Sequence, residues 1–209
     1  MLPLNRPFLL SDRTLCGRRK APVFYLTRLM ARVLLTPFFN IESLNRGFVP
    51  EEGAFILLPK HQRWEDIPLL SLASPRPLYY VAKHELFLNP VSAWFISSLG
   101  GIALNRRRPV ESRSGVRMML DCLGAGEGLV IFPEGTYVQG RVGPGHGGLL
   151  RMIRSRMAVP FIPVGIRYAG KRRKRVCIRF GRPLSEDPSM NAENLLNRIM
   201  TEVARLSGL

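Results

Sequence analysis

The chain has 209 residues, of which 46% are hydrophobic, and it carries 31 Lys and Arg against 15 Asp and Glu, a net charge of +16. This length supports one buried core, and the charge favours anionic partners such as nucleic acid, a membrane surface or phosphorylated substrates. The 3 cysteines are widely spaced and include no C-x-x-C pair, so neither a disulfide framework nor a zinc site is indicated. The sequence shows neither an apolar run of about 18 residues nor a signal-peptide core, so we expect a protein of a reducing compartment that meets a membrane only at its surface.

The first segment with helical periodicity is APVFYLTRLMARVLLTPFFNI, residues 21–41. Its large apolar residues recur near helical spacing, while Arg28 and Arg32 lie one turn apart on another face. This pattern predicts an interfacial helix whose basic residues meet anionic headgroups, and a helix packed on the core is the alternative. We therefore divide the chain into an N-terminal membrane-associating helical segment, residues 1–45, and one domain, residues 46–209.

Apolar runs and helical patterns alternate along that domain, which predicts a single α/β domain. The expected strands span residues 54–58, 78–82, 129–132, 159–166 and 176–180, and the expected helices span 66–73, 90–99, 111–124, 147–158 and 191–206. Pro160 and Pro163 interrupt the fourth strand, which a central hydrogen-bonded strand would avoid. The glycine-rich stretch at 140–148 predicts either a loop whose backbone approaches a ligand closely or a mobile surface connection.

The stretch LLPKHQRWEDIPLL, residues 57–70, places His61 and Asp66 five positions apart, directly after an apolar run. A neutral imidazole can take a proton from a hydroxyl near pH 7, and a carboxylate on its other ring nitrogen fixes the tautomer. On a continuous helix the two side chains would lie about 140° apart, so the pair requires a bend. Pro68 disfavours helical geometry at the preceding residue, so we expect the helix to begin near 67, with His61 in a loop and Asp66 in the first turn. A capping Asp66 beside a structural His61 is the alternative.

Three further blocks follow this pair along the chain. GGIALNRRRP, residues 100–109, delivers Arg106 and two further arginines after a short apolar piece. IFPEGTYVQG, residues 131–140, places Phe-Pro-Glu-Gly-Thr directly after an apolar strand, and the proline-containing run VPFIPVGI spans 159–166. Loops that follow parallel strands gather at one edge of the sheet, so these blocks are expected to meet there.

In this order the four blocks resemble those of the glycerolipid acyltransferases of the 1-acylglycerol-3-phosphate (lysophosphatidic acid) acyltransferase type. His61 and Asp66 match the H-x4-D block, residues 101–106 the arginine-bearing block, residues 132–136 the F-P-E-G-T block, and residues 159–164 the proline-containing block. The resemblance spans about residues 50–185. It implies that residues 46–209 form an acyltransferase domain with a mixed, mostly parallel sheet flanked by helices, similar to glycerol-3-phosphate acyltransferase, preceded by the N-terminal amphipathic segment.

The resemblance also implies a reaction, in which a fatty acyl group moves from an acyl thioester, on coenzyme A or acyl carrier protein, to the hydroxyl of a lysophospholipid. His61 would be the general base and Asp66 its orienting partner, with no cofactor or metal ion. Glu134, Gly135 and Thr136 would help to bind the acceptor. Such an enzyme would be peripheral or monotopic on the cytoplasmic face of a membrane, where the donor, the acceptor and the surface are all anionic.

The identity of the acceptor depends on the basic residues around the site. Arg106 would contact the phosphate of lysophosphatidic acid, whose acylation gives phosphatidic acid. Tyr137 stands where many phosphate-acceptor members of the family have Arg, so a lyso-aminolipid or a zwitterionic lysophospholipid is the alternative acceptor.

Two alternatives belong to other classes of protein. The run GKRRKR, residues 170–175, is compatible with a nucleic-acid-binding protein, with a membrane-facing loop or with a solvated hairpin, but no DNA-binding motif or aromatic stacking pattern accompanies it. We therefore expect no specific nucleic-acid partner. A serine or cysteine hydrolase that uses His61 is disfavoured, because the G-x-S-x-G elbow is missing and none of the three cysteines lies in a motif that would make it a nucleophile.

Overall fold

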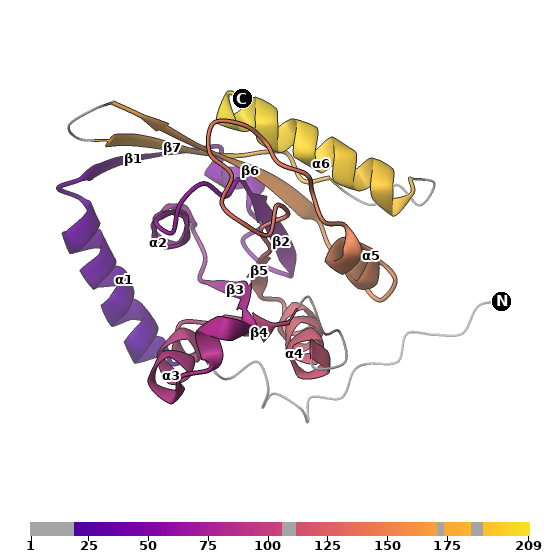
Figure 1. Cartoon of the computed structure of the whole chain (residues 1–209), viewed down its shortest axis with the longest axis horizontal. Coiled ribbons are helices and arrows are strands. Elements are labelled where there is room, and N and C mark those ends of the chain that lie inside the picture. The colour runs from indigo at the N-terminus through magenta and orange to yellow at the C-terminus, as the bar shows by residue number, and fades with distance from the viewer. Residues whose placement is uncertain (1–18, 106–111, 171–173, 185–189) are drawn as a thin grey trace.

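The computed structural model describes residues 19–105, 112–170, 174–184 and 190–209 (Figure 1). The α-helices are α1 (Ala21–Leu35), α2 (Asp66–Ala73), α3 (Pro90–Ser98), α4 (Arg113–Gly124), α5 (Gly148–Arg154) and α6 (Ala192–Ser207). The 3-10 helices are η2 (Arg46–Phe48) and η3 (His84–Phe87). The strands are β1 (Phe39–Leu44), β2 (Phe55–Pro59), β3 (Leu78–Lys83), β4 (Gly101–Leu104), β5 (Gly128–Val130), β6 (Phe161–Ala169) and β7 (Lys174–Phe180).

The described strands form one 7-stranded sheet in the order β1-β7-β6-β2-β5-β3-β4. Strands β6 and β7 pair antiparallel, and every other neighbouring pair in this sheet is parallel. The parallel arrangement brings the carboxyl ends of β2, β5 and β3 to one edge. These findings confirm the α/β domain with a mixed, mostly parallel sheet flanked by helices.

Helices cover both faces of the sheet, and the side chains of each central strand alternate between two clusters of the core (Figure 1). In β2, Ile56 and Leu58 pack in the cluster that includes α4, α5 and α6, whereas Phe55 and Leu57 pack in the cluster that includes α2. A strand buried on both faces needs no polar side chains. This explains why the central strands appear in the sequence as continuous apolar runs.

The 5 strands and 5 helices expected within residues 46–209 are all present, with boundaries shifted by up to four residues. The sequence patterns do not predict β1 and β4, the two edge strands of the described sheet, and the helical segment expected over 21–41 ends at Leu35, because Phe39–Leu44 form β1. β4 has only four residues, and β1 alternates apolar residues with Asn40 and Glu42. The division at residue 45 remains a prediction, although β1 lies within 1–45 and pairs with β7.

Pro160 and Pro163 predicted that the fourth expected strand would not be a central one. This prediction is wrong, because β6 lies inside the sheet, between β7 and β2. Pro163 precedes by one residue the first registered pair of the β6–β7 ladder, Val164 with Phe180. Its carbonyl accepts a hydrogen bond of 2.8 Å from the backbone N–H of Gly181, just beyond β7. The missing N–H of Pro163 therefore lies on the side of β7, just before the regular β6–β7 ladder begins, where its loss costs little.

Helix α1 turns most of its apolar residues away from the protein. Phe24 is its buried residue and Leu35 packs partly on the core, whereas six of its large apolar side chains are 53% to 63% exposed: Tyr25, Leu26, Leu29, Met30, Val33 and Leu34. The helix therefore packs on the domain through a narrow face. Within the described ranges, none of the helices combines the length and hydropathy needed to cross a bilayer.

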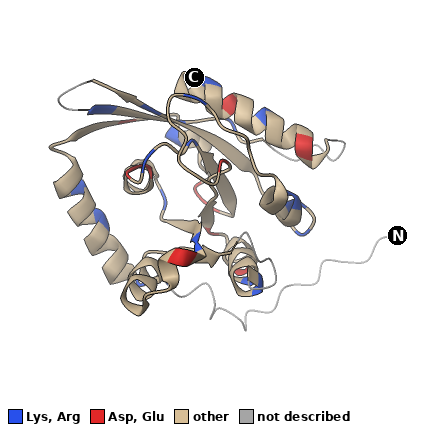
Figure 2. Ribbon diagram, viewed as in Figure 1, with Lys and Arg blue, Asp and Glu red and all other residues tan. Residues whose placement is uncertain are grey.

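Basic residues lie on several surface elements of the described chain, including α1 and α5, while acidic residues appear on α6 (Figure 2). The predicted basic loop is described only from Lys174 onward, where β7 begins. Residues 171–173 lie outside the described residues, and so do 106–111.

Candidate active site

The histidine and aspartate of the H-x4-D block meet at the carboxyl end of β2. The chain leaves the strand at Pro59 and enters α2 at Asp66, so His61 lies in the connecting loop and Asp66 in the first turn of the helix. This is the bend that Pro68 predicts. His61 Nδ1 lies 3.1 Å from Asp66 Oδ2, and the Asp66 side chain is fully buried. The ring nitrogen that remains available to a substrate is therefore Nε2.

The carboxylate of Asp66 is held by three further donors. The backbone N–H groups of Gln62 and Arg63 donate to Oδ2, at 2.5 Å and 2.8 Å, and the hydroxyl of Tyr168 donates to Oδ1 at 2.5 Å. Burial first, and then the charge of Asp66, raises the pKa of Tyr168, so its hydroxyl keeps its proton and remains a donor. The sequence carried no signal for Tyr168, because it reaches the site from β6, 102 positions further along the chain.

Two aromatic rings of the loop that follows β5 fix the plane of the imidazole. The ring of Phe132 stacks on His61 with the centroids 3.7 Å apart and the planes at 24°, and Tyr137 meets its edge at 4.5 Å and 61°. Because β5 is the parallel neighbour of β2, the two loops emerge side by side. The structure thus brings the F-P-E-G-T block against the H-x4-D block, as expected.

Glu134 points into the protein and is only 2% exposed. Its carboxylate lies 2.8 Å and 3.0 Å from the Nζ of Lys60, and it accepts hydrogen bonds from the backbone N–H groups of His61 and Gly143. Lys60 was not singled out by the sequence patterns, although it directly precedes His61. The predicted contact of Glu134 with the acceptor remains a prediction, and its oxygens already have partners within the protein.

Gly135 and Thr136 form the outer turn of the same loop. Gly135 adopts a positive φ of 68° and donates its N–H to the carbonyl of Phe132 at 3.1 Å, a conformation that favours glycine. Thr136 is exposed at the surface of the turn. The glycine-rich stretch closes over this block, since His146 N–H donates to the carbonyl of Pro133 at 2.9 Å.

An open hollow lies beside the imidazole, between the loop that follows β2 and the loop that follows β5. Gln62, Arg63, Trp64 and Glu65 line one side, and Tyr137 and Gln139 line the other. Arg106 belongs to the residues outside the described ranges, so its predicted phosphate contact is not placed. Among the residues that are described, no cluster of three or more His, Cys, Asp and Glu side chains could hold a metal ion. A reaction without cofactor or metal remains a prediction.

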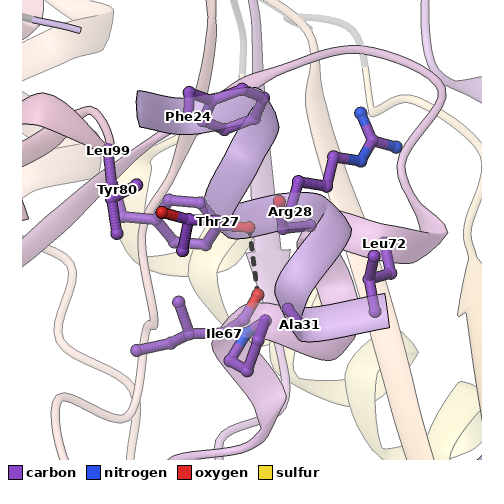
Figure 3. A pocket seen from close by; sticks show the side chains of 10 residues that line it. Phe24, Thr27, Arg28, Ala31, Ile67, Leu72, Tyr80 and Leu99 are labelled. Carbon is purple, nitrogen blue, oxygen red and sulfur yellow. Dashed lines mark hydrogen bonds between the residues drawn. The ribbon is translucent and has the colours of Figure 1, made fainter. Parts of the chain in front are cut away.

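A second cavity, of about 170 Å³, lies between α1, α2 and β3 (Figure 3). Phe24 and Ala31 line it from α1, and Ile67 and Leu72 line it from α2. The hydroxyl of Tyr80 donates to the carbonyl of Ile67 at 3.3 Å, so the polar groups at its wall are partly satisfied. The cavity is lined by the face of α2 that carries Ile67 and Leu72, whereas Asp66 lies on the buried face that packs on the core, so α2 separates this mainly apolar space from the dyad.

The chain as a whole is similar to several known proteins. The family model described as Acyltransferase matches residues 40–167. The chain is 28% identical to the 1-acyl-sn-glycerol-3-phosphate acyltransferase of Streptococcus pneumoniae over 87% of its own length and 72% of the relative. It is also 28% identical to the lyso-ornithine lipid O-acyltransferase of Pseudomonas aeruginosa, over 87% of its own length and 63% of that relative.

A plant relative and a solved structure extend these similarities. A chloroplastic 1-acyl-sn-glycerol-3-phosphate acyltransferase of Brassica napus is 30% identical over 80% of the chain, which spans 48% of that relative. The crystal structure of the 1-acyl-sn-glycerophosphate (LPA) acyltransferase PlsC from Thermotoga maritima superposes with a TM-score of 0.72 at 25% identity, covering 96% of this chain and 83% of that one.

Proposed function

Since this chain belongs to the acyltransferase family, we propose that it moves a fatty acyl group from an acyl thioester to the free hydroxyl of lysophosphatidic acid and so makes phosphatidic acid. The observation that carries the proposal is the hydrogen bond between His61 Nδ1 and Asp66 Oδ2, at the edge of the sheet where the F-P-E-G-T loop also emerges. The enzyme is an acyltransferase. Our proposal concerns its acceptor, its donor and the roles of single residues.

In the proposed reaction, Nε2 of His61 takes the proton of the acceptor hydroxyl while the hydroxyl oxygen attacks the thioester carbonyl. Asp66 holds Nδ1 protonated, so Nε2 carries the lone pair, and its charge stabilises the imidazolium that forms. The tetrahedral intermediate then collapses, the carbon–sulfur bond breaks, and the proton on Nε2 passes to the departing thiolate. The products are the new ester and a free thiol on coenzyme A or acyl carrier protein, and His61 returns to its neutral form.

The polar hollow next to the dyad suits the headgroup of a lipid substrate. Arg63 lines it together with amides and aromatic edges, and Glu65 adds one acidic side chain. The apolar cavity lies on the other side of α2 from Asp66, and it offers separate space to an apolar chain, since burying methylene groups is favourable by about 0.8 kcal/mol each.

We further propose that the protein docks on the cytoplasmic face of an anionic membrane through the exposed apolar side chains of α1. Most large apolar residues of this helix are exposed, and Arg32 supplies an exposed basic group, whereas Arg28 is turned toward α2 and donates to the carbonyl of Ser74 at 3.1 Å. Interfacial helices combine these two features. The apolar side chains Val91 and Trp94 of α3 are also exposed and extend the surface on a helix that contacts α1.

A lyso-aminolipid remains the second candidate acceptor. It is favoured by one observation, the similarity to lyso-ornithine lipid O-acyltransferases, together with Tyr137 in the place where many phosphate-acceptor members have Arg. A single assay separates the two candidates: purified protein is given acyl-CoA or acyl carrier protein thioester with lysophosphatidic acid, lysophosphatidylcholine or lyso-ornithine lipid, and release of thiol is followed. Preferred acylation of lysophosphatidic acid supports the first candidate, and preferred acylation of lyso-ornithine lipid replaces it with the second.

The role of Arg106 gives the same assay a residue-level test. If Arg106 binds the phosphate, Arg106→Ala raises the KM for lysophosphatidic acid by the equivalent of about 1.5 to 3 kcal/mol and leaves the KM for the thioester nearly unchanged. The matched control is Arg117→Ala, which removes an exposed arginine of α4. An equal effect of the two variants would contradict the phosphate contact.

A further inference from the structure

Lys60 is a fully buried cation that the proposed reaction does not use. Lysine is almost never buried to this degree unless an anion accompanies it. Here the anion is Glu134, whose two carboxylate oxygens lie 3.0 Å and 2.8 Å from Lys60 Nζ. Because Lys60 is the residue directly before His61, the ion pair lies at the backbone of the proposed general base.

The carboxylate of Glu134 has no free side for a substrate. Its Oε2 also accepts the backbone N–H of His61 at 3.1 Å, and its Oε1 also accepts the backbone N–H of Gly143 at 2.7 Å. A carboxylate offers about four lone-pair positions, and these contacts together with the two from Lys60 use them. Contact with an acceptor hydroxyl would require one of these buried partners to leave.

Lys60 also joins the two loops that form the site. Its Nζ donates to the carbonyl oxygens of His61 and Val138, and the N–H of Val138 in turn donates to the carbonyl of His61 at 2.8 Å. The backbone of His61 is therefore bound on its N–H and its C=O side to the loop that carries Phe132 and Tyr137. The same loop supplies the two rings that hold the imidazole.

We propose that Lys60 and Glu134 are positioning residues, whose buried ion pair fixes the backbone and hence the ring of His61, and that Glu134 serves the reaction through this pair without touching the acceptor. The inference rests on the proposed function only in taking His61 as the base. A buried ion pair is weak evidence of stabilisation, since removing both charges is often neutral, whereas removing one leaves an uncompensated charge. The geometry supports a different role for the Lys60–Glu134 pair, which is to hold the neighbouring His61 in position.

A spectroscopic experiment tests the positioning without any substrate. The face of the Phe132 ring, which stacks on His61 with the centroids 3.7 Å apart, should shift the ring protons of His61 upfield in the NMR spectrum, and His61→Asn would identify those signals by their loss. In Lys60→Met and in Glu134→Gln the signals should move toward the values of an unstructured histidine. Glu127→Gln is the matched control, because it breaks a partly buried pair with Arg19 and should leave the signals in place. Unmoved signals in both site variants would overturn the inference.

Kinetics on folded protein provide the second measurement. Below the unfolding temperature, Lys60→Met and Glu134→Gln should each lower kcat by about 10- to 100-fold, the range expected when a catalytic group is misplaced. The KM for the acceptor should stay within about threefold of the parent, and the double variant should be no slower than either single variant, because the two residues act as one unit. The double variant leaves no unpaired charge. If a single variant does not fold, the NMR comparison and the kinetics are therefore carried out on the double variant.

Two kinetic outcomes contradict the inference, and a third concerns only the proposed function. A raised acceptor KM in Glu134→Gln with parental kinetics in Lys60→Met would return Glu134 to direct contact with the acceptor. Parental kcat in both folded variants would reduce the pair to a purely structural one. If the parent transfers no acyl group to any lysolipid, the proposed function fails, and the NMR comparison still decides whether the pair positions His61.

Discussion

Replacing Asp66 by asparagine removes a charge from the site and preserves its shape, because of how the carboxylate is held. Oδ2 receives His61 Nδ1 and the backbone N–H groups of Gln62 and Arg63, while Oδ1 receives the hydroxyl of Tyr168. The two backbone donors fix the amide oxygen of Asn at the Oδ2 position. This oxygen can still accept from Nδ1, and the amide nitrogen can donate to a rotated Tyr168 hydroxyl.

The effect of Asp66→Asn should therefore be electrostatic. A hydrogen bond to a charged group contributes about 1.5 to 3 kcal/mol against about 0.5 to 1.5 for a neutral one, a difference of about 1 to 1.5 kcal/mol. With tenfold in rate for about 1.36 kcal/mol, kcat should fall about 5- to 13-fold. His61→Ala, which removes the base itself, should cost about 10²- to 10⁴-fold.

The assay is release of thiol from an acyl thioester with saturating lysophosphatidic acid, at a temperature where circular dichroism shows the variants to be folded. Asp121→Asn is the matched control, since it makes the same change on α4 and should retain activity within about twofold. Asp66→Asn as inactive as His61→Ala would refute the reasoning, because it would show that the tautomer or the position of the ring is lost. If Asp66→Asn is as active as the parent, the charge of Asp66 does not stabilise the imidazolium.

Three further variants test packing, ionisation and docking. Gly165→Ala would place a Cβ 2.3 Å from the backbone of α6, so urea denaturation should show a loss of about 1 to 3 kcal/mol or more, whereas Gly148→Ala, with nothing within 4 Å, should change stability by less than about 1 kcal/mol. The raised pKa of Tyr168 favours the protonated phenol in the folded state, so its contribution is complete below about pH 10, the ordinary tyrosine value, and is lost as the pH rises above it. Tyr168→Phe should flatten this alkaline decline in the unfolding free energy, and an unchanged decline would contradict the assignment. Replacing both Leu29 and Val33 by Asn should leave the fold intact, since both are about 60% exposed, and weaken sedimentation with anionic vesicles by about tenfold; unaltered sedimentation would exclude this face of α1.

Features that depend on nearby residues were predictable from the sequence. The start of α2 near Asp66 agrees with Pro68, which lies in the first turn, where a backbone N–H has no helical partner, although Ile67 before it is helical and not extended. The central strands were predicted because burial on both faces leaves uninterrupted apolar runs. The meeting of the two site loops was expected because parallel strands end at the same edge.

Features that depend on distant residues were not predictable. Lys60 resembled an ordinary surface lysine, since its partner Glu134 is 74 positions away, and Tyr168 reaches Asp66 across 102 positions. Pro163 was expected to exclude a central strand, yet the fold places its missing N–H beyond the end of the ladder with β7. The edge strand β1 was missed because its first residues, 39–41, continue the apolar pattern of the helical segment expected over 21–41, and only the pairing with β7 distinguishes them.

The pairing of β1 with β7 sets an order on the synthesis of this protein. Phe39 is registered with Lys174, so the edge of the sheet cannot form until β7 has been translated. At about 5 to 20 residues per second, the interval between the ends of β1 and β7 lasts on the order of 10 s. Throughout that interval α1 has already been translated, and its apolar side chains, which the sheet does not cover even in the finished fold, face the surroundings. A nascent chain whose α1 binds a lipid surface at once would complete its sheet there, with those side chains shielded from other nascent chains.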